Sequence, residues 1–241
     1  MPKAPPPKTS SNIRSKRTTT TKEAASTTKP TTTKSKGRGK DSHLYTDDNP
    51  STTLPGTGFK DASTATQTLT LVSKRSLTYQ FQTINTMYHR ALHHPHKTEA
   101  MEEAIGIFKD WIDVTYPAMK GELRGEGGFK PLLSKDIVKK FRERIEEEVN
   151  EGDRRFVDVY LGLGKNKRLG NVLLDDTEPG GKDWEVERYE ALDGLVGEGK
   201  ETKDGWEYDE LWTKEKAPTV GHLKLIAWAW SPVPGRTLAG K

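Results

Sequence analysis

The sequence predicts a mainly α-helical protein with a small β element, an α+β fold, preceded by a disordered basic tail. Three observations support this prediction. Apolar residues recur every three or four positions across much of residues 59–150, which is typical of helices packed on one side. A short run near the C-terminus alternates instead, as a strand does. The first forty residues are almost devoid of apolar side chains.

The tail contains eleven Lys and Arg residues against one acid, Glu23, and its only large aliphatic residue is Ile13. It therefore carries a net charge of +10, while the other 201 residues carry −6. Such a segment cannot bury enough apolar surface to offset its conformational entropy, so we expect disorder and an affinity for polyanions. Turn-forming residues continue to Gly58, which makes residues 1–58 a tail and linker.

Residues 59–120 are expected to form a three-helix unit. Asp61 can cap a first helix over about 62–73, and a second helix covers about 77–92 before Pro95. Thr98 can cap a third helix, which we expect Pro117 to end. Trp111 belongs to the predicted buried side of that third helix.

Residues 129–241 are expected to form a C-terminal helical region that packs on the first unit. It begins with a helix over about 135–150, followed by a short helix from Phe156, for which a strand is the alternative. Residues 175–215 contain 15 acids and 5 bases, and they are interpreted as an acidic loop anchored by aromatic residues. The apolar run 222–230 predicts a terminal strand, with a buried helix as the alternative.

The composition excludes several classes of protein. The chain has no cysteine, which excludes disulfide scaffolds and thiolate metal sites. No apolar run approaches the 18 residues of a membrane span. The segment 162–168 has two glycines followed by basic residues, but it fails the pattern of a phosphate-binding P-loop and predicts a tight basic turn. We therefore assign no catalytic residue, no cofactor and no metal ligand.

Four histidines lie within eight residues, at positions 89, 93, 94 and 96. His89 and His93 share one helical face, a spacing that can hold a transition metal. The preferred interpretation is that this cluster lies at the C-terminal end of the second helix, where cations and donors meet free carbonyl groups. A metal-dependent enzyme centred on the cluster remains an alternative.

The function predicted from these features is that of a non-enzymatic nuclear protein that associates with nucleic acid or chromatin. Mitochondrial and cytoplasmic locations are the alternatives to the nucleus, and no membrane association is expected. A protein-interaction or scaffold module, which binds a basic partner through residues 175–215, is the first alternative function. The candidate nucleic-acid contacts are cations of the tail and of the two ends of the second helix: Lys34, Lys36, Arg38, Lys40, Lys74, Arg75, Arg90, His93, His94, His96 and Lys97.

Overall fold

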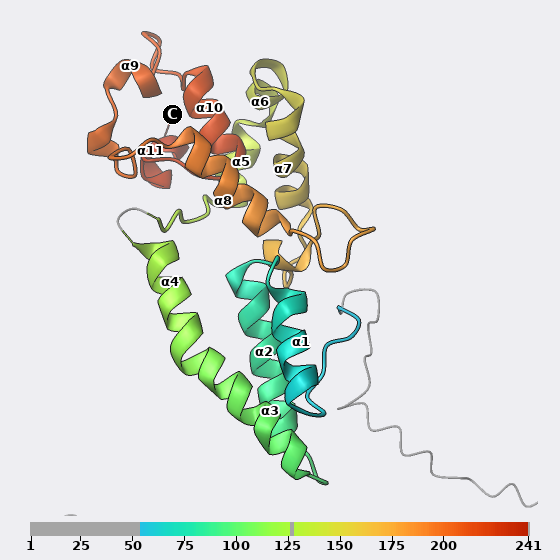
Figure 1. Cartoon of the computed structure of the whole chain (residues 1–241). Coiled ribbons are helices and arrows are strands. Elements are labelled where there is room, and N and C mark those ends of the chain that lie inside the picture. Colours follow the sequence, from blue (N-terminus) through green and yellow to red (C-terminus); the bar gives the residue numbers. More distant parts are fainter. Residues whose placement is uncertain (1–53, 126–127, 241) are drawn as a thin grey trace, which may run out of the picture. The chain divides into compact units, whose positions relative to one another are not determined.

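The computed structural model describes residues 54–125 and 128–240, and these residues are mostly helical, as the sequence predicts (Figure 1). Their first helices are α1 (Ala62–Val72), α2 (Leu77–Leu92), α3 (Glu99–Asp110) and α4 (Tyr116–Arg124). A π-helical turn, η1 (Trp111–Thr115), joins α3 to α4. Figure 1 shows α1, α2 and α3 side by side, around a core that contains Ile84 and Phe108.

The first two helices end where the sequence predicts. The third does not end at Pro117, because η1 and α4 continue the helical segment past this residue. Pro117 lies in the first turn of α4, and the preceding η1 turn has a wider bond, from the Tyr116 amide to the Trp111 carbonyl. Proline lacks an amide hydrogen and its ring clashes with the preceding turn, and a π-bulge can absorb both effects without ending the helix. Trp111 is buried with 7% exposure, as predicted.

The remaining helices are mostly short. They are α5 (Lys135–Lys140), α6 (Arg142–Glu148), α7 (Glu151–Gly162), α8 (Trp184–Leu195), α9 (Tyr208–Leu211), α10 (Val220–Ala227) and α11 (Gly235–Ala239), with 3₁₀ turns η2 (Leu169–Asn171) and η3 (Lys203–Gly205). The helix expected over 135–150 is divided at Phe141, whose backbone leaves helical geometry between α5 and α6. The segment at Phe156 is helical, in α7, and not a strand.

The expected terminal strand is wrong, because residues 220–227 form α10. Thr219 caps this helix through its hydroxyl oxygen, which accepts from the His222 amide at 3.2 Å. Leu223, Leu225 and Ile226 are all buried, so the helix is enclosed on nearly every side. The exposed positions of α10 are confined to its first turn, at Val220 and Gly221, so its sequence shows little amphipathic period and resembles a strand. Among residues 54–125 and 128–240 only two isolated β-bridges occur, Leu173 with Asp183 and Trp212 with Pro218.

The expected acidic loop is also wrong over much of its length. Residues 175–215 contain α8, η3 and α9. Trp184 and Trp212 are buried, as expected of anchors, whereas Tyr208 is 59% exposed. The inner side of α8 carries the fully buried Arg188, which interrupts the apolar pattern by which a helix is recognised.

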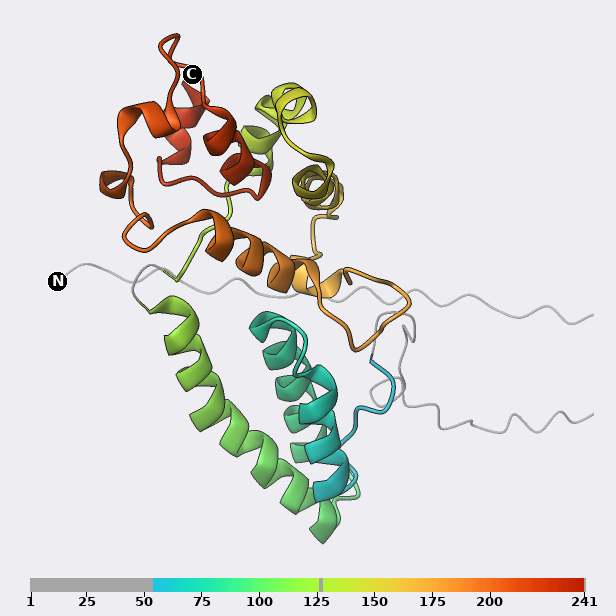
Figure 2. The same ribbon diagram turned by 45° about the horizontal axis from the view of Figure 1, so that its top comes forward.

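A buried ion pair joins α8 to the turn before α2. Asp183 caps α8 by accepting from the amides of Glu185 and Val186, both at 3.1 Å. Its other carboxylate oxygen accepts from Arg75 Nε at 3.2 Å and from the Ser76 amide at 2.8 Å. Figure 2 shows α8 beside the end of α2 at which these bonds form.

Candidate polyanion-binding surfaces

The turn between α1 and α2 carries two of the predicted nucleic-acid contacts, Lys74 and Arg75, and only Lys74 is accessible to a ligand. Lys74 is exposed. Arg75 is only 4% exposed, because its guanidinium pairs with Asp183 and also donates to the Gly170 carbonyl at 2.8 Å. A buried, paired guanidinium is not available to a phosphate group, so Arg75 is removed from the candidate contacts. Asp183 lies 108 residues away in the sequence, and no local pattern reveals this partner.

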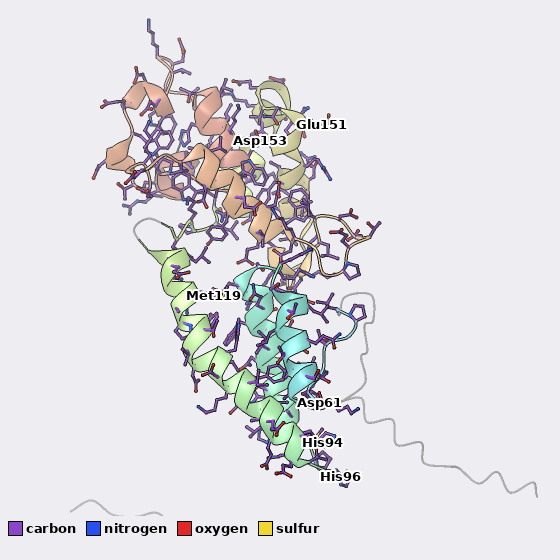
Figure 3. All side chains as sticks on the ribbon, in the orientation of Figure 1. Asp61, His94, His96, Met119, Glu151 and Asp153 are labelled. Carbon is purple, nitrogen blue, oxygen red and sulfur yellow. The ribbon has the colours of Figure 1, made fainter. Side chains whose placement is uncertain are left out.

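The histidine cluster lies at the other end of α2, where Figure 3 labels His94 and His96. His93 is the C-cap residue of α2, and its amide donates to the His89 carbonyl. The rings of His89 and His93 are stacked, with centroids 6.2 Å apart, and His94 meets Phe59 edge to face. These contacts place the cluster at a helix C-terminus.

The same end of α2 presents further cations. Lys97 is exposed, and Arg90 is half-buried beside a cavity of about 380 Å³ that Phe59 also lines. Within the part of the chain that the structure describes, no three His, Cys, Asp or Glu side chains gather as a metal site would require. The four predicted tail contacts, Lys34, Lys36, Arg38 and Lys40, lie outside the described residues.

A second group of cations surrounds a cavity of about 520 Å³, called the basic cavity below. Six cationic side chains and one carboxylate line it, together with aromatic and aliphatic groups. The lining residues are Thr78, Phe129, Lys130, Pro131, Leu132, Lys135, Tyr160, Leu163, Gly164, Lys165, Lys167, Arg168, Leu169, Glu185, Arg188 and Tyr189.

One wall of the basic cavity is the turn that follows α7. Its exposed cations are Lys165, Lys167 and Arg168, and no acid lies between residues 163 and 169. The Lys167 amide donates to the Gly164 carbonyl at 3.0 Å, and Leu169 is buried, so both ends of the turn are held in place.

Lys135 fixes the start of the same turn. Its ammonium group donates to the carbonyl groups of Leu161, at 3.2 Å, and Leu163, at 2.6 Å. These carbonyls lie at the C-terminus of α7, where a cation is favoured by the helix dipole. The Tyr160 hydroxyl donates to the Leu133 carbonyl at 2.6 Å, which joins α7 to the segment before α5.

Arg188 is the most buried cation of the cavity, with 2% exposure. Its Nε donates to the Trp228 carbonyl at 2.9 Å and its Nη2 to the Ala229 carbonyl at 3.3 Å, at the C-terminus of α10. Burial lowers the pKa of Arg188 to about 10, so the guanidinium is still protonated at neutral pH. Burial also raises the pKa of Glu185, whose carboxylate accepts a hydrogen bond from the Thr78 hydroxyl at 2.7 Å.

An apolar lip faces the solvent on the segment between α4 and α5. Phe129 is 52% exposed and Leu132 is 47% exposed, although both are large apolar residues. The guanidinium carbon of Arg124 lies 4.9 Å from the centroid of the Phe129 ring. Lys130 lies between Phe129 and Leu132 in the sequence and is buried, with its ammonium nitrogen 2.7 Å from a carboxylate oxygen of Asp193. The cavity thus combines cationic and apolar surface.

The sequence contained one signal for this cavity, the glycines and cations of residues 162–168. The segment lacks the strand, helix and Gly-Lys-Ser/Thr ending of a P-loop, so the signal alone does not indicate a phosphate site. In the folded chain the turn lines a cavity together with residues that are distant in the sequence, Arg188 on α8 and Phe129 after α4. No local spacing relates these three segments.

An acidic cavity of about 730 Å³ lies elsewhere on the same region. Four carboxylates line it, those of Asp153, Asp175, Asp176 and Glu187, together with Arg155 and the indoles of Trp184 and Trp228. The Trp228 indole nitrogen donates to the Asp153 carboxylate at 2.7 Å.

Comparison with known proteins finds no family model, no curated protein and no solved structure that matches this chain. Within residues 54–125 and 128–240, no helix has the length and apolar character of a membrane span.

Proposed function

We propose that the protein associates with nucleic acid or chromatin in the nucleus, as a non-enzymatic binding protein. The observation that carries the proposal is the division of charge in the chain, with +10 on the first forty residues and −6 on the remainder. A segment of that charge attracts polyanions over about a Debye length and exchanges counterions for phosphate groups.

Cations on the rest of the chain support the same function. Lys74 and Lys97 are exposed near the two ends of α2, and Lys165, Lys167 and Arg168 are exposed on the turn after α7. These sites give the otherwise acidic part of the chain local surfaces that attract phosphate groups.

The test is the salt dependence of binding to a DNA duplex, measured by mobility shift or anisotropy. We compare the full chain with a variant that lacks residues 1–40. Each lost phosphate contact lowers the slope of log K against log salt by about 0.9. The shortened variant should therefore show a much flatter slope and weaker binding. An unchanged slope would contradict the role of the tail.

The nuclear location is proposed on two short basic segments, 13–17 and 34–40, which have the composition of import signals. Replacing Arg14, Lys16 and Arg17 with Gln, with and without the same change at Lys34, Lys36, Arg38 and Lys40, should move a fluorescent fusion out of the nucleus. A fusion that stays nuclear in the combined variant would contradict this part of the proposal.

A scaffold function is the second candidate, and the acidic cavity favours it. Its four carboxylates suit the Lys and Arg side chains of a basic peptide through complementary charge. Replacing Asp176 with Asn and Glu187 with Gln should weaken binding of a Lys/Arg-rich peptide. The matched control replaces Glu143 and Glu147 on α6 with Gln. Equal binding by both variants would count against a specific site at the acidic cavity.

A further inference from the structure

We propose that the basic cavity binds one nucleotide unit, and that this unit belongs to a single-stranded nucleic acid. In this binding mode the phosphate group lies against Lys165, Lys167 and Arg168. The base lies against the exposed apolar lip of Phe129 and Leu132. This inference rests on the proposed nucleic-acid function and assigns part of it to a defined site.

The cations of the turn are the first reason. Lys165, Lys167 and Arg168 are exposed on one wall, within four consecutive residues. Two other cations of the cavity are engaged, since Lys130 pairs with Asp193 and Lys135 binds carbonyl groups of α7. The three cations of the turn are therefore the ones presented to a ligand.

The burial of Arg188 is the second reason, and it is independent of the turn. Its hydrogen bonds to the Trp228 and Ala229 carbonyls hold the guanidinium without neutralising it. Within residues 54–125 and 128–240 no carboxylate forms an ion pair with this side chain, and Glu185, which also lines the cavity, interacts with it at longer range. A buried cation without a paired anion raises the positive potential of the cavity beside it, because charges interact more strongly away from water. That potential favours the binding of an anion inside the cavity over its pairing with a cation at the solvated surface.

The apolar lip makes a base the natural second part of the ligand. Phe129 and Leu132 expose about half of their surface beside cations, an arrangement that suits a ligand with one anionic and one flat apolar part. Aromatic side chains beside basic grooves are the usual platforms on which the bases of single strands stack. A volume of about 520 Å³ is also within the range of small-ligand sites.

The ligand is assigned to a single strand because the bases of a duplex are already stacked on each other. A free nucleotide has the same chemistry, and so the experiment includes both sources. A phosphate group without a base would use the turn but not the lip. Inorganic phosphate therefore tests whether the lip contributes.

The experiment uses the full chain and three variants. The site variant replaces Lys165, Lys167 and Arg168 with Gln. The control variant replaces Lys60, Lys139 and Lys203 with Gln, which removes the same charge from exposed positions outside the cavity. The third variant is Phe129→Ala, which changes a half-exposed side chain and so tests the lip with little effect on folding. Circular dichroism melting curves check that all variants keep the fold of the parent.

The first measurement is the anisotropy of a fluorescent oligo-dT at a fixed salt concentration, beside a duplex of equal charge. We expect the site variant to bind the single strand at least about tenfold more weakly, and the control to change by less than about threefold. Phe129→Ala should weaken single-strand binding by about tenfold and leave duplex binding unchanged. Equal behaviour of the site and control variants, with the tail-dependent salt slope intact, would overturn the cavity and leave the proposed function standing.

The second measurement is calorimetric titration with AMP and with inorganic phosphate. AMP should bind more tightly than phosphate, and this difference should disappear in Phe129→Ala. Equal affinities in the parent would overturn the assignment of a base to the lip. If the full chain binds no oligonucleotide, the proposed function fails. AMP binding that the site variant loses would then assign the cavity to a free nucleotide, and its absence would overturn the cavity as well.

Discussion

Residues 54–125 and residues 128–240 are both mostly helical, but different bonds hold their helices. In the first region the helices are regular apart from the π-helical turn η1, and the cap bonds are local, as between Asp61 and the amide of Thr64 at 2.8 Å. In the second region most helices are shorter, and side chains bind backbone groups far away, as Arg188 binds the Trp228 carbonyl forty residues later. Local caps also begin α7, α8 and α10, so the two regions differ in the long-range bonds that the second region adds to its caps.

Two aspartates make this difference measurable, because each caps a helix. Asp61 caps α1 and is partly exposed, whereas Asp183 caps α8, has no exposed surface, and also pairs with Arg75. Asp183→Ala should lower the free energy of unfolding by about 3–5 kcal/mol, since it leaves a buried guanidinium without its carboxylate. Urea denaturation of the parent and the variant gives the value.

The matched control is Asp61→Ala. It removes a cap of the same chemistry without uncovering a buried charge, so it should cost about 1 kcal/mol. Equal losses in the two variants would contradict the distinction between the regions, because they would mean that the Arg75–Asp183 pair adds nothing beyond the cap.

The same distinction explains what the sequence could predict. The two helices over 62–73 and 77–92 were predicted within a residue or so, because each has a polar cap and an apolar stripe along one side. The helix α8 was missed, because its inner side carries Arg188 in place of an apolar residue. The helix α10 was mistaken for a strand, because it is buried on nearly every side.

The sequence also predicts the residues of the candidate site only where their state does not depend on tertiary contacts. The exposed cations Lys74 and Lys97 could be found from the sequence, since exposure is the ordinary state of such residues. The burial of Arg75 and the convergence of Phe129, Arg188 and the turn 163–169 on one cavity depend on tertiary contacts. A sequence pattern can identify the turn, but it cannot identify what the turn faces.

A second test of the C-terminal region uses the pH dependence of its stability. His222 is fully buried in α10, with Nδ1 3.0 Å from the Leu211 carbonyl and Nε2 2.8 Å from the Ser231 hydroxyl. Burial lowers the pKa of His222 from 6.5 to about 4, so the folded protein keeps this ring neutral while the unfolded chain takes up a proton. The contribution of this histidine to the free energy of unfolding is therefore fully present above pH 6.5. It is lost as the pH decreases from 6.5 to 4, by about 3 kcal/mol.

Urea denaturation at several pH values between 4 and 7 measures this loss, and His222→Asn should remove it. The raised pKa of Glu185 acts in the opposite direction, since the folded protein then binds its proton more readily than the unfolded chain. The lowered pKa values of Asp61, Asp175 and Glu210 remove stability only as the pH falls below their ordinary values, 3.8 for the aspartates and 4.5 for Glu210, so the loss above pH 5 reports on His222. A loss between pH 6.5 and 4 that persists in His222→Asn would contradict the assignment to this histidine.

The smallest expected effect concerns a helix of the first region. Gly106 lies inside α3, is exposed, and has open space where a Cβ atom would lie. Gly106→Ala should raise the free energy of unfolding by about 0.5–1 kcal/mol, because alanine loses less backbone entropy when the helix forms. Gly56→Ala is the control, because Gly56 has a φ of +87° and a substitution there should destabilise the protein. If Gly106→Ala has a lower melting temperature than the parent, then α3 depends on contacts at this position that its regular geometry does not require. That result would contradict the difference drawn between the two regions.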